Sequence, residues 1–514
     1  MEVFNQSGLQ SAAPAANEDS QDHNFSGLKS NTAVPERLQQ IKRKIMNAKR
    51  NLIQIWLLCA AMLQAVTGKA QDLTFNSSTY PVGSGPVIPA VADINGDGKL
   101  DLIIPISVFS CADPTHNSSG TTLVVLTNNG SGGFGSNATL TVGTGPIDVA
   151  AADLNGDGYV DLISANITDS TLTVLTNNGT GGFGLSATLS VGAGPSCVVA
   201  ADVNGDGCLD LISANSHSNT LTVWFNNGRG GFVTNATLTV GTGPYCLAAA
   251  DVNGDGYVDL ISANYGGGSG NSLTVLTNNG SGGFGYNATL TVGQGPLWVV
   301  AADVNGHGKP DLICANFSGN SWTVLTNDGS GGFGINATLN DPIGGFFPSA
   351  FAVGDFNGDG YVDLICGTSG PGCSGGDNYL IVFTNNGSGA FGYNTTLSAG
   401  NKPNPVGADL SGDGKMDLLV ANYLDGTVTV LMNTSLFQTP TLTPTLTVKQ
   451  QSRNICVAWP YPSPGWELQE NPDLTKPNWL PSGYDGYGIT DDGTNKSLTM
   501  PPTPGSLFFR LLHP

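Results

Sequence analysis

The sequence predicts an all-β protein: a seven-bladed β-propeller with four-stranded blades, followed by a small C-terminal domain that resembles a β-sandwich. A loop rich in Asp, Asn and Gly recurs seven times, at intervals of 49 to 60 residues. Four short apolar segments with the period of a strand accompany each loop. One extra strand precedes the first unit, and the last unit lacks its fourth strand. The two ends of the repeat region can therefore complete one blade together.

The first 70 residues have the features of an export signal. A basic stretch ends at Arg50, an apolar run covers 52–66, and Gly68-Lys69-Ala70 fits cleavage before Gln71. The apolar run is too short for a comfortable membrane span. We expect residues 1–70 to be a leader, with the true signal peptide at 46–70. The mature protein is then expected to be secreted or displayed on a bacterial cell surface, without insertion into the membrane.

Each repeat unit follows one order of elements, for which the second unit is representative. Gly145-Pro146 precedes a first strand at 149–152, and the Asp loop follows it. A second strand at 161–165 and a third at 171–176 come next. An Asn-Asn-Gly hairpin, whose residues tolerate positive φ, then leads to a fourth strand at 187–191. This order is typical of a propeller blade, and the propeller is predicted to span 71–436.

The ends of the repeat region favour a closed ring. The seventh unit has strands at 418–421 and 427–431 but no fourth strand before residue 435. The segment at 73–82 matches a fourth strand and precedes the first Gly-Pro. If it completes the last blade, both ends of the region close the ring. An open solenoid with the same repeats is the alternative.

A Thr/Pro-rich stretch at 437–447 predicts a stiff, extended linker after the repeats. Residues 448–514 then form a separate small β domain, for which we expect the role of a spacer, with display or sorting as the alternative. Its strand candidates are 455–459, 466–469, 497–500 and 507–511.

The charge distribution restricts the function. The net charge of −21 argues against nucleic-acid partners and against attraction to anionic lipid. From Gln71 to Pro440 the chain has 28 Asp, no Glu and five basic residues, and 20 of these Asp lie in the repeated loops. Because only the shorter carboxylate is used, a specific geometry is indicated.

The repeated loop has the oxygen pattern of a calcium site. Side-chain oxygens fall at positions 1, 3, 5 and 9, Gly falls at positions 4 and 6, and the backbone carbonyl of position 7 can add a ligand. Three carboxylates within nine residues would repel one another without a cation. Flanking strands and the loop length exclude an EF-hand, and Mg²⁺ fits less well because it demands a strict octahedron. Metal-free Asx turns are the alternative.

We therefore predict up to seven Ca²⁺ sites. The fifth is expected to be weak or empty, because His307 puts an imidazole nitrogen at position 5. The seventh keeps an oxygen at Ser411. The predicted ligands, with position 7 contributing its carbonyl, are Asp93, Asn95, Asp97, Lys99, Asp101, Asp153, Asn155, Asp157, Tyr159, Asp161, Asp202, Asn204, Asp206, Cys208, Asp210, Asp251, Asn253, Asp255, Tyr257, Asp259, Asp303, Asn305, Asp311, Asp355, Asn357, Asp359, Tyr361, Asp363, Asp409, Ser411, Asp413, Lys415 and Asp417.

Together with a Phe-Gly after the hairpin, the loop resembles FG-GAP/VCBS repeats, and the blades are similar to those of the integrin α-chain propeller. The resemblance implies a seven-bladed propeller with calcium at positions 1, 3, 5, 7 and 9. His307, Ser411 and Val233 depart from the pattern, and the family does not fix a ligand. The Phe-Gly pairs are Phe134-Gly135, Phe183-Gly184, Phe284-Gly285, Phe333-Gly334 and Phe391-Gly392.

The face opposite the Asp loops is the predicted binding face. All large insertions fall in its loops, at 105–121, 265–271, 340–349 and 367–378. Function concentrates on variable loops that a rigid scaffold holds. Aromatic residues on this face are Phe109, Tyr265, Phe317 and Tyr423, and those singled out as partner-binding candidates are Tyr245, Trp298, Phe346 and Phe347.

These features predict a non-catalytic binding or adhesion module for an extracellular glycan or protein. Glycosidases need a pair of carboxylates, but Glu is absent from the repeats, and Asp148, near the predicted axis, is the acid of most interest outside the loops. A secreted polysaccharide lyase or hydrolase and a structural surface-layer component are the alternatives.

Two further patterns are left open by the sequence. Cys366 with Cys373, and Cys197 with Cys246, could pair or remain free thiols. Asn-Ala-Thr meets the glycosylation pattern, although a strand repeat also produces it, at Asn137, Asn235, Asn287 and Asn336.

Overall fold

The computed structural model describes residues 73–109, 118–130, 132–344, 347–370 and 378–435, together with seven strands between 447 and 512. The predicted leader lies outside the described residues, as does the predicted linker except for Thr447.

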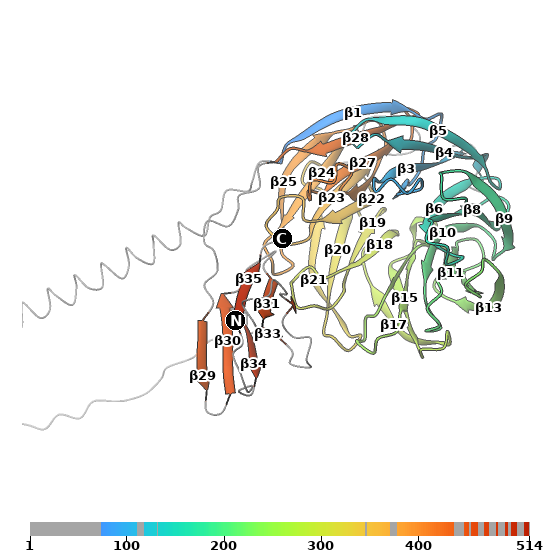
Figure 1. Ribbon diagram of the computed structural model, residues 1–514. Helices are drawn as coiled ribbons and strands as arrows, with labels where there is room; N and C mark the ends of the chain where they lie inside the picture. The colour runs from blue at the N-terminus through green and yellow to red at the C-terminus, as the bar shows by residue number, and fades with distance from the viewer. Residues whose placement is uncertain are drawn as a thin grey trace, which may run out of the picture. The chain divides into compact units, whose positions relative to one another are not determined.

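Seven four-stranded antiparallel sheets stand as blades around a ring, which confirms the predicted propeller (Figure 1). Blade 1 consists of β2 (Ala90–Ala92), β3 (Asp101–Phe109), β4 (Ser118–Asn128) and β5 (Phe134–Thr141). Blade 2 consists of β6 (Pro146–Ala152), β7 (Asp161–Asn166), β8 (Thr171–Asn177) and β9 (Phe183–Ser190). Blade 3 consists of β10 (Pro195–Ala201), β11 (Asp210–Asn215), β12 (Thr220–Asn226) and β13 (Phe232–Thr239). Blade 4 consists of β14 (Pro244–Ala250), β15 (Asp259–Asn264), β16 (Ser272–Asn278) and β17 (Phe284–Thr291).

The remaining blades repeat this order. Blade 5 consists of β18 (Pro296–Ala302), β19 (Asp311–Asn316), β20 (Ser321–Asn327) and β21 (Phe333–Asn340). Blade 6 consists of β22 (Phe347–Gly354), β23 (Asp363–Ser369), β24 (Tyr379–Asn385) and β25 (Phe391–Ser398). Blade 7 consists of β26 (Pro403–Ala408), β27 (Asp417–Asn422), β28 (Thr427–Asn433) and β1 (Phe75–Pro81).

The ring closes through β1, as predicted. β1 pairs antiparallel with β28, from Phe75 opposite Asn433 to Pro81 opposite Thr427. The Thr74 N–H also donates to Ser435 Oγ at 3.0 Å, and the Thr434 N–H donates to the Thr74 carbonyl at 2.8 Å. Figure 1 shows the two strands side by side. This pairing rules out the open solenoid.

Burial changes systematically across a blade. The second strand, such as β7, is buried at every position, because other strands flank it and neighbouring blades cover both its faces. Its Leu and Ile therefore form a continuous apolar run. The fourth strand, such as β9, is mostly exposed at the rim and is rich in Thr, Ser and Asn. The hydrophobic core thus consists of the layers between blades.

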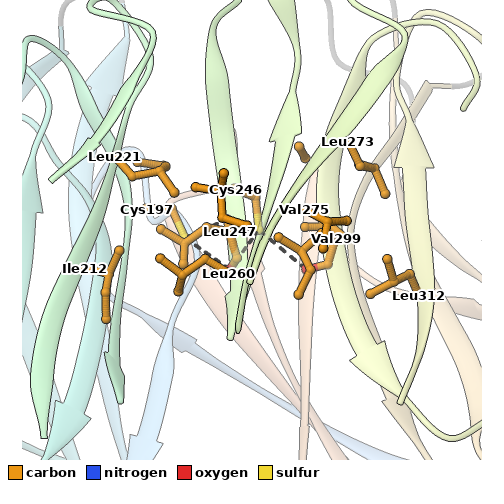
Figure 2. Close-up of a cluster of buried hydrophobic side chains, with 14 of the residues drawn as sticks. Cys197, Ile212, Leu221, Cys246, Leu247, Leu260, Leu273, Val275, Val299 and Leu312 are labelled. Carbon is orange, nitrogen blue, oxygen red and sulfur yellow. Dashed lines mark hydrogen bonds between the residues drawn. The ribbon is translucent and has the colours of Figure 1, made fainter. Parts of the chain in front are cut away.

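The interface from blade 3 to blade 5 shows how these layers are built (Figure 2). Leu247 of β14 packs between Cys197 and Ile212 of blade 3 and Val299 and Leu312 of blade 5. Because apolar burial stabilises by about 25 cal/mol per Å², such contacts favour stacking of adjacent blades.

The C-terminal strands form two sheets. One has the order β29-β30-β34-β33 and the other β32-β31-β35. All four predicted strands are present, as β30, β31, β34 and β35. The bounds are β29 (Thr447–Gln451), β30 (Asn454–Pro460), β31 (Glu467–Asn471), β32 (Leu480–Pro481), β33 (Ile489–Asp491), β34 (Asn495–Met500) and β35 (Phe508–Leu512).

The described cysteines of the propeller are free thiols, so Cys197 and Cys246 are not bonded to each other. Cys366 is also free and buried, and its possible partner Cys373 lies outside the described residues. One short 3-10 helix, Gly266–Gly268, lies in blade 4. Within the described part of the chain, no helix has the length and apolar character needed to cross a membrane.

Candidate metal loops and binding face

Each Asp loop is held by its own side chains. In the second loop, Asp153 Oδ1 accepts the Gly156 N–H and Oδ2 accepts the Gly158 N–H, both at 2.8 Å. Asn155 Oδ1 accepts the Asp157 N–H at 2.9 Å. Gly156 and Gly158 have φ of 75° and 86°, which only glycine adopts without strain. The backbone is therefore tightly curled around the side chains at positions 1 and 3. Within the described residues, only the fifth loop brings the ligand atoms of three carboxylate or imidazole side chains to within 4.8 Å of one another.

The position-9 carboxyl has a second, structural role. Asp161 is fully buried at the start of β7. Its Oδ1 accepts the Asn177 N–H at 2.8 Å, and its Oδ2 accepts the Leu154 N–H at 3.1 Å. Burial raises the pKa of this carboxyl, and the charges of Asp157 and Asp153 raise it further. Asp161 thus ties the metal loop to the end of the third strand.

The donor set fits a calcium ion. A carboxylate oxygen that accepts one N–H keeps lone pairs for a cation. In the sixth loop, Asp363 Oδ2 is buried and has no hydrogen-bond partner. In the other loops the equivalent oxygen accepts the N–H of position 2, from Ile94, Leu154, Val203, Val252, Val304 and Leu410. A cation would satisfy the orphaned oxygen, whose isolation otherwise costs stability.

With calcium bound, the carboxylates of positions 1, 5 and 9, the position-3 amide oxygen and the position-7 carbonyl would hold the ion. The remaining loops have the same position-1 contacts as the second loop: Gly N–H groups donate to Asp93, Asp202, Asp251, Asp303, Asp355 and Asp409. The loops are thus one geometry repeated around the ring.

The side chains at position 7, where only the backbone carbonyl is a predicted ligand, have defined places. Lys99 Nζ lies 3.6 Å from Asp97 Oδ2, and Lys415 Nζ lies 3.7 Å from Asp413 Oδ2. Tyr159 covers Gly179 of the hairpin so closely that a Cβ there would lie 2.6 Å from its ring. Position 7 therefore links the loop to the hairpin, and in two loops it places a cation beside the position-5 carboxylate.

A ring of asparagines connects the loops, and sequence reasoning missed it. The Asn that ends each third strand donates from Nδ2 to the position-2 carbonyl of the preceding blade's loop, at 2.6 to 2.9 Å. The recurrent first Asn of Asn-Asn-Gly was the available signal. These donors are Asn128, Asn177, Asn226, Asn278, Asn327, Asn385 and Asn433.

The asparagines of Asn-Ala-Thr make a second link between blades. Asn235 Nδ2 donates to the Gly282 carbonyl at 2.8 Å, and Asn336 Nδ2 donates to the Gly389 carbonyl at 2.9 Å. Each of these asparagines is the bulged residue of its fourth strand. Because glycosylation would remove an Nδ2 hydrogen and add bulk there, the motif is better explained by this contact.

The opposite face gathers four aromatic rings, here called the aromatic arc: Tyr245, Tyr265, Phe317 and Phe347. Ring centroids are 5.7 Å apart for Tyr245–Tyr265, 6.2 Å for Tyr265–Phe317 and 4.9 Å for the stacked pair Phe317–Phe347. The rings come from blades 4, 5 and 6 and are half-buried.

The arc contains two of the four partner-binding candidates, Tyr245 and Phe347. Trp298, which is also half-buried, packs against the hydrophobic layers on both sides of blade 5 and has no ring contact with the arc among the described residues. Phe346 lies outside the described residues. Tyr265 and Phe317, which the sequence placed on this face without singling them out, complete the arc.

Asp148 lies on β6 at the inner end of blade 2 and is 7% exposed. Its Oδ2 accepts the Val198 N–H at 2.9 Å and its Oδ1 accepts the Val149 N–H at 3.0 Å. Burial raises its pKa to about 6. In the next blade Cys197 takes the equivalent position, and its Sγ accepts the Leu247 N–H at 3.4 Å (Figure 2). The Asp148 carboxyl therefore connects inner strands.

A cavity of about 430 Å³ lies at the seam where β1 meets blade 1. Tyr80 and Phe134 line it, with ring centroids 5.8 Å apart. The Tyr80 hydroxyl donates to the Gly132 carbonyl at 3.2 Å and accepts the Phe134 N–H at 3.4 Å. Between blades 7 and 1, the Tyr80 hydroxyl thus makes the contact with a glycine carbonyl that a bulged asparagine makes between other blades.

The fold and the loops define a β-propeller built from Asp-loop repeats. The sequence model of the FG-GAP-like repeat family matches residues 108–164, 153–213, 202–262, 251–314 and 303–366. The sequence model of the FG-GAP repeat family matches residues 347–389. The chain belongs to the FG-GAP repeat family. In a comparison with curated proteins, no sequence matches significantly.

Two solved structures are similar to this chain. BBS1N in complex with ARL6DN, soaked with lead, matches with a TM-score of 0.50 and 12% identity, over 71% of this chain and 99% of that chain. A protein from Lactobacillus plantarum matches with a TM-score of 0.47 and 16% identity, over 74% of this chain and 94% of that chain. Because the sequence identity to BBS1N is only 12%, this similarity shows a shared fold alone.

Proposed function

We propose that this protein is an exported, calcium-binding propeller that acts as a non-catalytic binding or adhesion module for an extracellular glycan or protein. The proposal rests on a difference between the two faces of the propeller. One face repeats the same Asp loop in every blade, whereas the other gathers the aromatic arc from three blades.

Calcium would act as a stiffener. The ion would neutralise the carboxylates at positions 1, 5 and 9, which otherwise repel one another. Since each loop is tied to the next blade by an asparagine, a filled loop would also fix the angle between blades. Extracellular calcium is compatible with weak sites of order 10⁻⁴ to 10⁻³ M. FG-GAP repeats are typical of extracellular proteins, which agrees with the predicted leader.

The aromatic arc supplies the proposed contact surface. Aromatic rings provide large contact areas at low cost in conformational entropy, and Tyr adds a hydroxyl for hydrogen bonds. Such a surface suits stacking on a sugar ring or on an apolar peptide side chain. The loops that carry it are braced by backbone bonds such as Tyr265 N–H to the Gly243 carbonyl at 2.9 Å.

The test is a glycan and matrix-protein array probed with the purified protein, with calcium and with EDTA. We expect binding in calcium, reduced binding in EDTA, and at least a tenfold loss of affinity in Tyr265→Ala. Thr291→Ala, on the exposed rim of the same blade, is the matched control. Turnover of any arrayed polymer would overturn the non-catalytic proposal, and an absence of binding would favour a structural role.

A further inference from the structure

We propose that the fifth loop is a distinct metal site, which takes a zinc-type transition-metal ion through Asp303, His307 and Asp311 in place of calcium. The inference rests on the proposed function only in assuming that the other loops hold calcium. Within the described residues, these three side chains can each bring one ligand atom to within 4.8 Å of the other two.

The separations in this group suit a small ion. His307 Nδ1 lies 3.4 Å from Asp303 Oδ1, and the ligand atoms of Asp303, His307 and Asp311 all lie within 4.8 Å of one another. Zinc bonds of about 2.0–2.2 Å in a tetrahedron put neighbouring ligand atoms roughly 3.3–3.5 Å apart. The group therefore needs only small movements to close around such an ion, and water can supply a fourth ligand.

The orientation of the imidazole is fixed as in metal-binding histidines. Nε2 lies 3.0 Å from the Asn327 carbonyl oxygen, which can only accept, so Nε2 carries the proton. This leaves a lone pair on Nδ1, the nitrogen nearest Asp303. Metal-ligating histidines commonly donate their other N–H to a carbonyl in this way. The Lys309 N–H contacts Nδ1 at 3.2 Å, and a metal would displace that contact.

The buried carboxylate is equally well placed. Asp311 is fully buried, and its oxygens accept the Asn327 N–H at 2.7 Å and the Val304 N–H at 3.1 Å. Each of these oxygens retains a lone pair. Asp303 accepts the Gly306 and Gly308 N–H groups, so all three ligands are held in position by backbone contacts before any metal arrives, which lowers the cost of binding.

The chemistry of the ligands decides between metals. An imidazole nitrogen suits zinc, copper, nickel and cobalt, whereas calcium prefers oxygen ligands. All other loops have Asp at position 5, so only this one exchanges a hard oxygen for nitrogen. The fifth loop is therefore expected to discriminate against calcium and in favour of zinc.

The test measures metal content in the full chain after chelation and dialysis against Zn²⁺ with excess Ca²⁺, by mass spectrometry. We expect His307→Ala to hold one zinc ion fewer per chain than the unaltered protein. His307→Asp, which restores the residue of the other loops, should lose the zinc and gain one calcium. His217→Ala, on the opposite face, is the matched control. Zinc bound by thiols such as Cys208 cancels in these differences.

The outcomes separate the two proposals. Equal zinc in the unaltered protein and both His307 variants, with calcium present, would overturn the fifth-loop site and leave the calcium proposal standing. If the His307 variants held less zinc than the unaltered protein and no calcium were bound, the fifth-loop site would stand and the calcium proposal would be overturned. Calcium retained by the unaltered fifth loop, shown by no gain in His307→Asp, would also overturn the inference.

Discussion

Asp148 shows how burial governs a single residue in this propeller. Its pKa is raised from 3.8 to about 6, even though two backbone N–H groups stabilise its charge. The folded state therefore binds the proton more tightly than the unfolded chain. The associated stability is fully present below about pH 4 and is lost as the pH rises to 6. The loss is about 3 kcal/mol at 1.36 kcal/mol per pKa unit.

Asp148→Asn should raise the free energy of unfolding at pH 7 by up to about 3 kcal/mol. Asn keeps an oxygen that can accept the Val198 N–H but carries no charge to bury. Urea unfolding at pH 4.5 and pH 7 measures the effect. The variant should also be less sensitive to pH over this range than the unaltered protein. Equal stabilities of the two proteins at pH 7 would contradict the assignment.

Substitutions at two residues of the second loop can distinguish a role in metal binding from a role in stability. Asp157→Asn keeps the oxygen that accepts the Tyr159 N–H but removes the charge of a proposed calcium ligand. It should bind one calcium ion fewer and leave the metal-free melting temperature within a degree or two. Calorimetric titration with calcium and thermal melts in EDTA measure the two effects. A large loss of metal-free stability would show that Asp157 is structural.

Asp161→Ala should behave differently, because it leaves the Asn177 and Leu154 N–H groups without their acceptor. At roughly 1–3 kcal/mol for each buried donor, it should lower the metal-free stability by several kcal/mol. Urea unfolding in EDTA measures this. If Asp161→Ala and Asp157→Asn lost equal stability without metal, the structural role of position 9 would be wrong.

At the scale of the element, the third strand of each blade belongs to the core and also forms a hydrogen bond with the preceding blade. Asn278 donates from Nδ2 to the Val203 carbonyl of the preceding blade at 2.8 Å and to the Val258 carbonyl of its own blade at 3.0 Å. Both bonds involve backbone at the metal loops. The end of each third strand therefore connects the loop of its own blade to the loop of the preceding blade.

Asn278→Ala should lower the free energy of unfolding by roughly 2 kcal/mol, at about 1 kcal/mol for each bond. It should also weaken calcium binding in the third loop, whose position-2 carbonyl loses its donor. Thermal melts and calcium titration measure the two effects, with Thr291→Ala as the exposed control. If only stability changed, the Asn278 hydrogen bonds would have no effect on calcium binding by the third loop.

The sequence predicts the local parts of each element well and the contacts between elements poorly. Strand periods, the Asp loops and the orphan strand before the first unit are readable because their signals lie within one repeat. The contact of the Asn278 side chain with the preceding blade could not be predicted in this way, because its acceptor, Val203, lies 75 positions away. The same limit explains Trp298, whose aromatic character fits a binding surface and a core equally well.

At the scale of the whole molecule, the carboxyls at position 9 act together. Burial raises the pKa of all seven. In the metal-free protein the folded state therefore favours their protonated form, and this contribution to stability is lost as the pH rises above about 4. The proposed calcium binding would need the deprotonated form and would therefore strengthen over the same range.

The difference in melting temperature between calcium and EDTA should therefore widen from pH 5 to pH 8. Scanning fluorimetry at fixed ionic strength measures it. A melting temperature that is unaffected by EDTA at every pH would contradict calcium binding altogether. A constant, non-zero difference would contradict only the role given to the buried carboxyls.

The pairing of β1 with β28 also sets an order of events during synthesis. Of the propeller strands, the one that completes blade 7 emerges first from the ribosome, but its partner follows about 350 residues later. Loop closure over such a separation is slow and entropically costly. The ring therefore cannot be finished until almost the whole repeat region has been made. If the chain is exported as we propose, this unfinished ring would be the form that a secretion channel receives.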